Sequence, residues 1–117
     1  MSLNIRLAGR GDWARLLPLV EAYYQFDSIA FDHVVTGRAL RRLLRDPSLG
    51  RAWIAEAGRS PAGYAILTYN YDLEFGGTQK IITDMFVGSR YRRKGLGTTL
   101  IEAICDNCRA NPKFPHL

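Results

Sequence analysis

The sequence is poor in the residues that bind metals or form disulfides. Its two histidines, His33 and His116, have no ligand partners at the spacing of a zinc site. Its two cysteines, Cys105 and Cys108, form a single C-x-x-C pair inside an expected helix, and no second pair accompanies them. We therefore expect no metal cofactor, and we interpret the cysteines as reduced thiols of a cytoplasmic protein.

Long apolar runs and long blocks of one charge are also missing. No apolar run approaches the length of about 18 residues that crosses a membrane, and the N-terminus lacks the features of a secretory signal. We therefore expect a cytoplasmic location and no membrane partner. The net charge of +5 suits an anionic ligand as well as nucleic acid. The arginines between residues 38 and 45 have no interleaved aromatics for stacking, so we interpret them as a solvated helix face and expect no nucleic-acid partner.

The chain of 117 residues is long enough for one domain with a modest core, and we treat 1–117 as a single domain. Alternating apolar residues predict a first strand over 3–7. Apolar residues at helical spacing predict a helix over 13–24 that Asp12 caps, and Pro18 should kink this helix or move its start. A second helix is predicted over 36–45.

The second half of the chain predicts three strands and a final helix. The strands are expected over 51–57, 62–71 and 79–87, and short turn signals between them predict antiparallel hairpins. Apolar residues at three- and four-residue spacing predict a helix over 96–110. The sequence therefore predicts an α/β (α+β) fold in the order β-α-α-β-β-β-α, with a mixed, mostly antiparallel sheet flanked by helices.

A basic, glycine-containing loop joins the last strand to the last helix. Its charged and flexible residues are Arg90, Arg92, Arg93, Lys94, Gly95 and Gly97. The first N–H groups of a helix have no partner inside it, and the helix dipole attracts negative charge, so this loop is suited to bind phosphate. The loop lacks the Gly-Lys-Ser/Thr of a Walker A motif, and Leu100 stands where a dinucleotide-binding motif needs its third glycine.

The pattern Arg92-x-x-Gly95-x-Gly97, after a strand that ends in Val87, resembles the acetyl-CoA pyrophosphate loop of the GNAT N-acetyltransferase superfamily. The resemblance implies acetyl-CoA as co-substrate and direct transfer of its acetyl group to a primary amine of a small molecule. It also implies that the strand backbone holds the thioester and pantetheine arm while the loop holds the pyrophosphate. The cofactor-binding residues would be Phe86, Val87, Arg92, Arg93, Lys94, Gly95, Leu96, Gly97 and Thr98.

An amine that is an ammonium ion at neutral pH needs a general base, and Asp84 is the candidate because it is a carboxylate within an apolar strand. A structural carboxylate bonded to the backbone or to a helix end is the alternative. The stretches 63–72 and 84–87 are similar to the polyamine (diamine) acetyltransferase branch, although Thr83 stands where that branch has a second acid.

The acceptor amine would contact Tyr24, Phe26 and Glu74, which the resemblance places near the acceptor pocket. Core packing is the alternative role for the two aromatic residues, and a solvated loop is the alternative for Glu74.

The superfamily continues beyond its fourth strand and third helix with a strand, a helix and further strands, and the later helix normally carries the tyrosine that protonates the leaving thiolate. The resemblance covers nearly all of this chain but not that C-terminal part of the fold. We therefore expect an exposed strand edge and helix face that favour a homodimer. A non-catalytic CoA-binding module derived from a GNAT enzyme is the alternative function, and a nucleic-acid-binding protein is a third.

Overall fold

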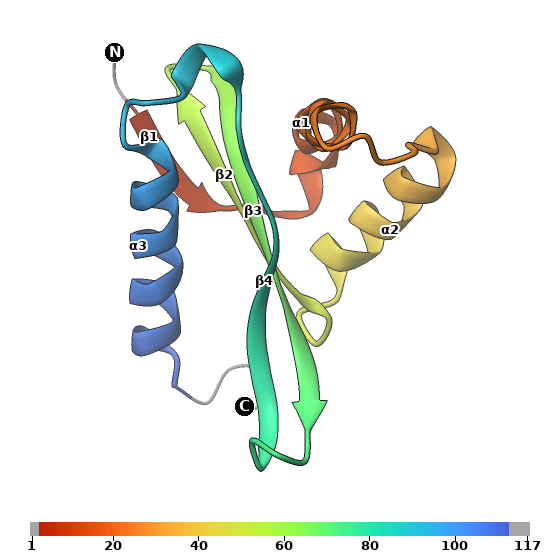
Figure 1. Cartoon of the computed structure of the whole chain (residues 1–117), viewed down its shortest axis with the longest axis vertical. Helices are drawn as coiled ribbons and strands as arrows, with labels where there is room; N and C mark the ends of the chain where they lie inside the picture. The colour runs from red at the N-terminus through yellow and green to blue at the C-terminus, as the bar shows by residue number, and fades with distance from the viewer. Residues whose placement is uncertain (1–2, 113–117) are drawn as a thin grey trace.

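The computed structural model describes residues 3–112, and the order of its helices and strands confirms the predicted order (Figure 1). Two short 3-10 turns, η1 and η2, precede α1 and α3. The elements are β1 (Leu3–Leu7), η1 (Arg10–Asp12), α1 (Trp13–Phe26), α2 (His33–Arg45), β2 (Gly50–Ala57), β3 (Ser60–Asp72), β4 (Gly77–Val87), η2 (Ser89–Tyr91) and α3 (Leu96–Ala110). His116 lies outside the described residues.

The four strands form one sheet in the order β1-β2-β3-β4, and each neighbouring pair in the described chain is antiparallel. A two-residue turn joins β2 to β3, and Gly58 adopts the left-handed conformation that this turn needs, with φ of 61°. The β3–β4 hairpin is longer and extends beyond the rest of the sheet (Figure 1).

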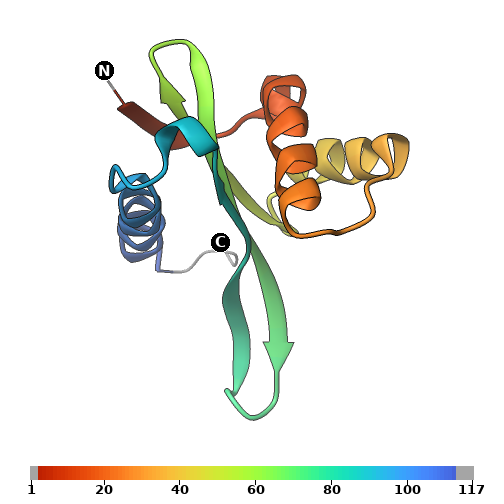
Figure 2. The same ribbon diagram turned by 45° about the horizontal axis from the view of Figure 1, so that its top comes forward.

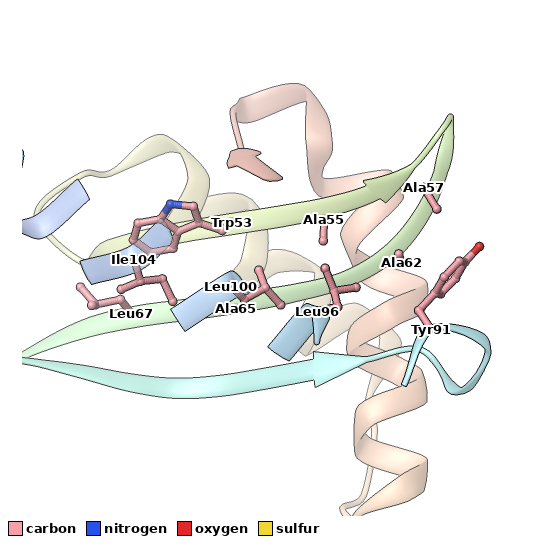
Figure 3. Close-up of a cluster of buried hydrophobic side chains, with 10 residues drawn as sticks. All are labelled: Trp53, Ala55, Ala57, Ala62, Ala65, Leu67, Tyr91, Leu96, Leu100 and Ile104. Atoms are coloured by element: carbon pink, nitrogen blue, oxygen red, sulfur yellow. The ribbon is translucent and has the colours of Figure 1, made fainter. Parts of the chain in front are cut away.

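Helices cover both faces of the sheet, with α1 and α2 on one side and α3 on the other (Figures 1 and 2). Alternation along β2 explains this arrangement, because Trp53 and Ala55 face α3 while Ile54 faces α1 and α2. Figure 3 shows the cluster on the α3 side, where side chains from α3 pack over β2 and β3. The buried cluster on this side is Trp53, Ala55, Ala57, Ala62, Ala65, Leu67, Tyr91, Leu96, Leu100 and Ile104.

Of the two N-terminal helices, α1 begins at the predicted residue and α2 begins earlier than predicted. Helix α2 starts at His33, three residues early, because the Asp32 carboxylate accepts hydrogen bonds from the first-turn N–H groups of Val34 and Val35 at 3.0 Å each. Helix α1 starts at Trp13 with Pro18 inside it, so the proline does not move the start.

The prediction that Asp12 caps α1 is wrong, because Asp12 stands at the N-cap position but its carboxylate accepts no hydrogen bond from the N–H groups of that helix. It accepts a hydrogen bond from the Gly9 N–H at 2.7 Å and two from the Arg6 guanidinium at 2.8 and 2.9 Å. Arg6 also reaches Glu56, which in turn binds Arg15, so the cluster ties β1, η1, α1 and β2 together.

The hydrogen bonds from Arg6 hold the pKa of Asp12 below its ordinary value. A carboxyl group whose pKa is lower in the folded state stabilises the fold above its unfolded pKa of about 4. That contribution is lost as the pH falls through the lowered pKa of Asp12.

Candidate functional site

The basic loop after β4 is held in place by the core beneath it. The Gly88 N–H donates to the Ala62 carbonyl at 2.8 Å, which continues the pairing of β3 and β4 by one residue. Tyr91 is buried against Ala57 and Ala62, as Figure 3 shows at the end of the sheet. Because Tyr91 anchors the loop, the residues that follow it run back to the start of α3 in a defined path.

The backbone of this loop takes left-handed conformations at two positions, Arg93 with φ of 64° and Gly95 with φ of 76°. Such a conformation at a non-glycine residue costs about 1–2 kcal/mol and is found most often at functional sites. Gly95 is the N-cap of α3, and it has no side chain to accept from the first-turn N–H groups. The described first turn of α3 also has no acidic residue, so these N–H groups are open to an anion.

The four cations of the loop are exposed, but Arg92 differs from the others. Its Nε donates to the Val87 carbonyl at 2.9 Å, and its guanidinium carbon lies 4.5 Å from the ring centre of Phe26 and 5.2 Å from that of Phe86. Arg92 therefore folds back over the end of β4 toward α1. To bind phosphate, as the family resemblance implies, the Arg92 guanidinium must release this carbonyl. Arg93 and Lys94, by contrast, form no ion pair within residues 3–112.

Asp84 lies at a β-bulge in β4. Ile66 pairs with Asp84 and Leu67 pairs with Ile82, so Thr83 is an extra residue between two paired positions. The Tyr64 hydroxyl donates to Asp84 Oδ2 at 3.1 Å, and Tyr64 is fully buried under α1.

A cavity of about 210 Å³ opens beside the Asp84 carboxylate, between the sheet and the first two helices. Most of its lining is apolar, and Asp84 is its acidic group. The lining residues are Val20, Tyr24, Thr36, Ala39, Leu40, Leu43, Ile66 and Asp84. An amine entering this space would meet one carboxylate within an apolar wall.

Burial raises the pKa of Asp84 above its ordinary value, and hydrogen bonds from Tyr64 and Thr83 offset only part of that effect. A carboxylate whose charged form is destabilised in this way binds a proton or a cation more strongly. The described partners of Asp84 are side chains of the same sheet, so it does not cap a helix end.

The predicted acceptor residues lie in three different places. Tyr24 lines the Asp84 cavity, and burial together with the nearby Asp84 charge raises the pKa of its hydroxyl. Phe26 is 66% exposed and makes an edge-on contact with Phe86 below Arg92, so it covers the end of β4 rather than the cavity. Glu74 is exposed in the β3–β4 turn, at the opposite end of β4 from the loop (Figure 1). The structure therefore does not bring Glu74 to the cavity, because the long hairpin carries it away.

Two contributors to the site were missed by sequence reasoning, Tyr64 and the bulge at Thr83. Tyr64 lies twenty residues before Asp84 in a strand with an apolar pattern, which is also the pattern of an ordinary core residue. The bulge has no local sequence signal. Within residues 3–112, no cluster of side chains could hold a metal ion, and none of the helices there combines the length and apolar character needed to cross a membrane.

Comparison with known proteins covers most of the chain. Residues 13–116 match the model of the acetyltransferase (GNAT) family. Among curated proteins, none matches this sequence. Among solved structures, an integron cassette protein from the mobile metagenome of Cole Harbour Salt Marsh is 34% identical with a TM-score of 0.84, and the match covers 91% of this chain and 70% of that one.

Two further solved structures share the fold at lower identity. A protein described as a predicted acetyltransferase, from Clostridium acetobutylicum and solved with acetyl-CoA, is 18% identical with a TM-score of 0.80, over 95% of this chain and 76% of that one. An aminoglycoside acetyltransferase from an uncultured soil metagenomic sample is 24% identical with a TM-score of 0.71, over 94% of this chain and 74% of that one. This chain thus spans 70–76% of the length of these three proteins.

Proposed function

Because the chain belongs to the GNAT acetyltransferase family, we propose that it transfers the acetyl group of acetyl-CoA to a primary amine of a small molecule in the cytoplasm. The observation that carries this proposal is that Asp84 and the basic loop share one end of β4. The loop starts after Val87, and Asp84 lies three residues before Val87, which is about 10 Å along the strand. The candidate proton acceptor therefore lies near the point where the chain leaves the sheet for the loop that would hold the phosphate.

The residues of the loop fit the acetyl-CoA pyrophosphate. Open N–H groups at the start of α3 would donate to the phosphate oxygens, and Arg93 and Lys94 would add positive charge. The backbone of Phe86 and Val87 would hold the thioester end. The Val87 carbonyl accepts from Arg92 at 2.9 Å, so Arg92 must move for that carbonyl to bind the pantetheine arm.

Asp84 would accept the proton of the incoming ammonium group. The amine nitrogen then attacks the acetyl carbon, the carbon–sulfur bond breaks, and the CoA thiolate leaves with the bonding electrons. The nitrogen releases its second proton as the amide forms, and the thiolate takes up a proton to leave as the CoA thiol. The raised pKa of Asp84 brings its proton affinity closer to that of an amine, which favours proton transfer. Tyr64 would position the carboxylate through its hydroxyl.

The cavity favours an acceptor with one ammonium group and an apolar body. Its volume of about 210 Å³ is small, and among its described lining residues Asp84 is the one acid. A polyamine or an aminoglycoside carries several positive charges and would need further acids. Thr83 also argues against a polycationic acceptor, since it is neutral where the polyamine branch has a second acid.

A CoA-binding module without catalysis is the alternative function. The contact between Arg92 and the Val87 carbonyl favours it, because this contact occupies a group that the thioester end of the ligand would use. The two functions differ in turnover and not in ligand binding.

Calorimetry with acetyl-CoA, followed by an assay for released CoA thiol, tests the proposal. We expect one acetyl-CoA to bind per chain and thiol release to depend on an added monoamine with an apolar chain. Binding without thiol release over a panel of such amines would support the non-catalytic module. Absence of binding would overturn both functions.

We also propose a homodimer, because β4 pairs only with β3 among the described residues and leaves its other edge open. Three apolar side chains of β4, Ile81, Ile82 and Met85, are 37–41% exposed. Ultracentrifugation of the wild type should give a dimer at micromolar concentration, and Ile82→Lys should shift it to monomer because a charge resists burial at an interface. Val35→Lys, on the exposed surface of α2, is the control and should remain dimeric. A stable, fully active wild-type monomer would refute the dimer.

A further inference from the structure

A second pocket, of about 620 Å³, lies on the outer side of the two N-terminal helices. Its wall consists of η1, the start of α1 and one face of α2. Four arginines line it, Arg10 from η1 and Arg38, Arg41 and Arg45 from α2. The three on α2 are spaced by three and four residues, which places them on the same helix face. We refer to this pocket, which these four residues line, as the arginine pocket.

The arginine pocket has no acidic residue in its lining. Among residues 3–112, none of its four arginines forms an ion pair, whereas Arg6 and Arg15 are both paired with carboxylates nearby. Positive charges held together around a concave surface repel one another, and the cleft concentrates their electrostatic potential where an anion would bind. An anion in the pocket would relieve this repulsion, so the surface is suited to bind one.

One of the four guanidinium groups is held flat. The guanidinium carbon of Arg41 lies 3.6 Å from the ring centre of Trp13, which is a face-on cation–π contact. A guanidinium stacked in this way keeps its edge N–H donors free for a planar acceptor, and the stacking reduces the entropy lost when it binds. The same contact covers a face of Trp13, so that face cannot stack on a base.

The arginine pocket is separate from the proposed acetyl-transfer site. The Asp84 cavity lies on the sheet side of α2, where Leu40 and Leu43 line it, while Arg38 and Arg41 point to the outer side. The CoA loop follows β4 and is not part of either lining. A ligand in the arginine pocket would therefore be a second ligand rather than part of acetyl-CoA.

We propose that the arginine pocket binds a small molecule that carries at least two phosphate groups. Its volume is in the range of small-ligand sites, and guanidinium groups match phosphate oxygens in pairs. Four cations without acids favour several negative charges over a single carboxylate. The concave shape and the covered face of Trp13 favour a small phosphate ligand over a nucleic acid. The arginines of α2 are thus more than the solvated face that their sequence pattern predicted.

Calorimetric titration with inorganic tripolyphosphate at physiological ionic strength tests this site on the full chain. The wild type should bind. The double variant Arg38→Gln/Arg45→Gln should bind at least about tenfold more weakly, because it loses charged hydrogen bonds to the ligand. The matched control is Arg42→Gln/Arg109→Gln, which also removes two positive charges, but from residues outside the pocket. This control should bind tripolyphosphate like the wild type. All four side chains are exposed, so circular dichroism should find both variants folded.

Three further measurements separate binding in the arginine pocket from binding elsewhere on the chain and from general attraction of anions. The loop variant Arg93→Gln/Lys94→Gln should keep the binding that the pocket variant loses. Citrate, a tricarboxylate, should bind more weakly than tripolyphosphate. Trp13 fluorescence should change on binding, and Trp13→Phe should lose that change.

Four results would each overturn the proposal. The first two are a wild type that does not bind tripolyphosphate, and an equal loss of affinity in the pocket variant and the control variant. The other two are a loss of affinity in the loop variant alone, and a citrate affinity equal to that for tripolyphosphate. Duplex DNA that binds more tightly than tripolyphosphate and depends on the same two arginines would replace the small molecule with a nucleic acid.

Discussion

Replacement of Asp84 by asparagine is expected to lower the rate of acetyl transfer by about 10²–10⁴-fold, the range contributed by a general base. The substitution keeps the size of the side chain and its ability to accept the Tyr64 hydrogen bond, but it removes the proton acceptor and the charge. Steady-state assays of thiol release should therefore find kcat/KM reduced. Calorimetry should find acetyl-CoA affinity almost unchanged, because the cofactor loop begins after Val87.

The stability of this variant provides its control. The folded-state pKa of Asp84 is raised, so its charged form opposes folding once the pH exceeds the unfolded pKa. Asp84→Asn should therefore unfold at neutral pH with an equal or higher free energy than the wild type. If Asp84→Asn is both slow and less stable, the lower rate would be explained by structural destabilisation rather than by loss of the proton acceptor. An unchanged rate would refute the role of Asp84 as general base.

The pH dependence of the wild type follows from the same carboxylate. Only deprotonated Asp84 accepts a proton, so the rate should rise with pH through the raised pKa, at higher pH than for an ordinary aspartate. Tyr64→Phe removes a hydrogen bond that lowers this pKa, and it should shift the rise to still higher pH. A shift to lower pH in Tyr64→Phe would contradict this role of the hydrogen bond.

Replacement of Arg92 by alanine is expected to weaken acetyl-CoA binding by about 1.5–3 kcal/mol, the contribution of a charged hydrogen bond. Two effects oppose each other in this variant. Loss of Arg92 removes a positive charge beside the phosphate site, but it also frees the Val87 carbonyl from an exposed hydrogen bond. The second effect is worth only about 0.5–1.5 kcal/mol, so the loss of charge should dominate in a calorimetric titration.

Two companion variants show how Arg92 acts. Arg109→Ala removes the same charge at the far end of α3, where Arg109 pairs with Asp106, and it should leave acetyl-CoA affinity unchanged. Arg92→Lys keeps the charge but loses the planar group that stacks on Phe26 and binds Val87 through Nε. An Arg92→Lys affinity equal to that of the wild type would assign the effect to charge alone. Equal affinity in Arg92→Ala and the wild type would refute the contribution of Arg92.

The sequence by itself determined the order of the elements and the location of the phosphate loop. The short, mostly apolar stretch over residues 51–57 predicts a strand, and apolar spacing over residues 96–110 predicts the helix that packs on it. The loop could be found because its glycines and cations are adjacent in the chain. These signals are local, since each depends on residues within one or two turns of one another.

Only the tertiary structure decided which distant side chains meet. Tyr64 binds Asp84 across the neighbouring strands β3 and β4, because their register pairs Tyr64 with Phe86 and Ile66 with Asp84 and so brings the two side chains close on one face. The bulge at Thr83 follows directly after this pairing, and no local pattern marks it. The tertiary structure also separated Glu74 from the cavity, since the length of a hairpin and not its composition sets where its tip lies.

The arginines illustrate the same division. Their spacing along α2 predicts one charged helix face, but the pocket exists because η1 brings Arg10 and α1 brings Trp13 to that face. Similarly, the sequence places Arg92 in the phosphate loop, while packing of α1 against β4 supplies the aromatic rings that draw it back. Secondary structure follows from the periodicity of neighbouring residues, whereas these contacts depend on how separate elements pack, which no short segment encodes.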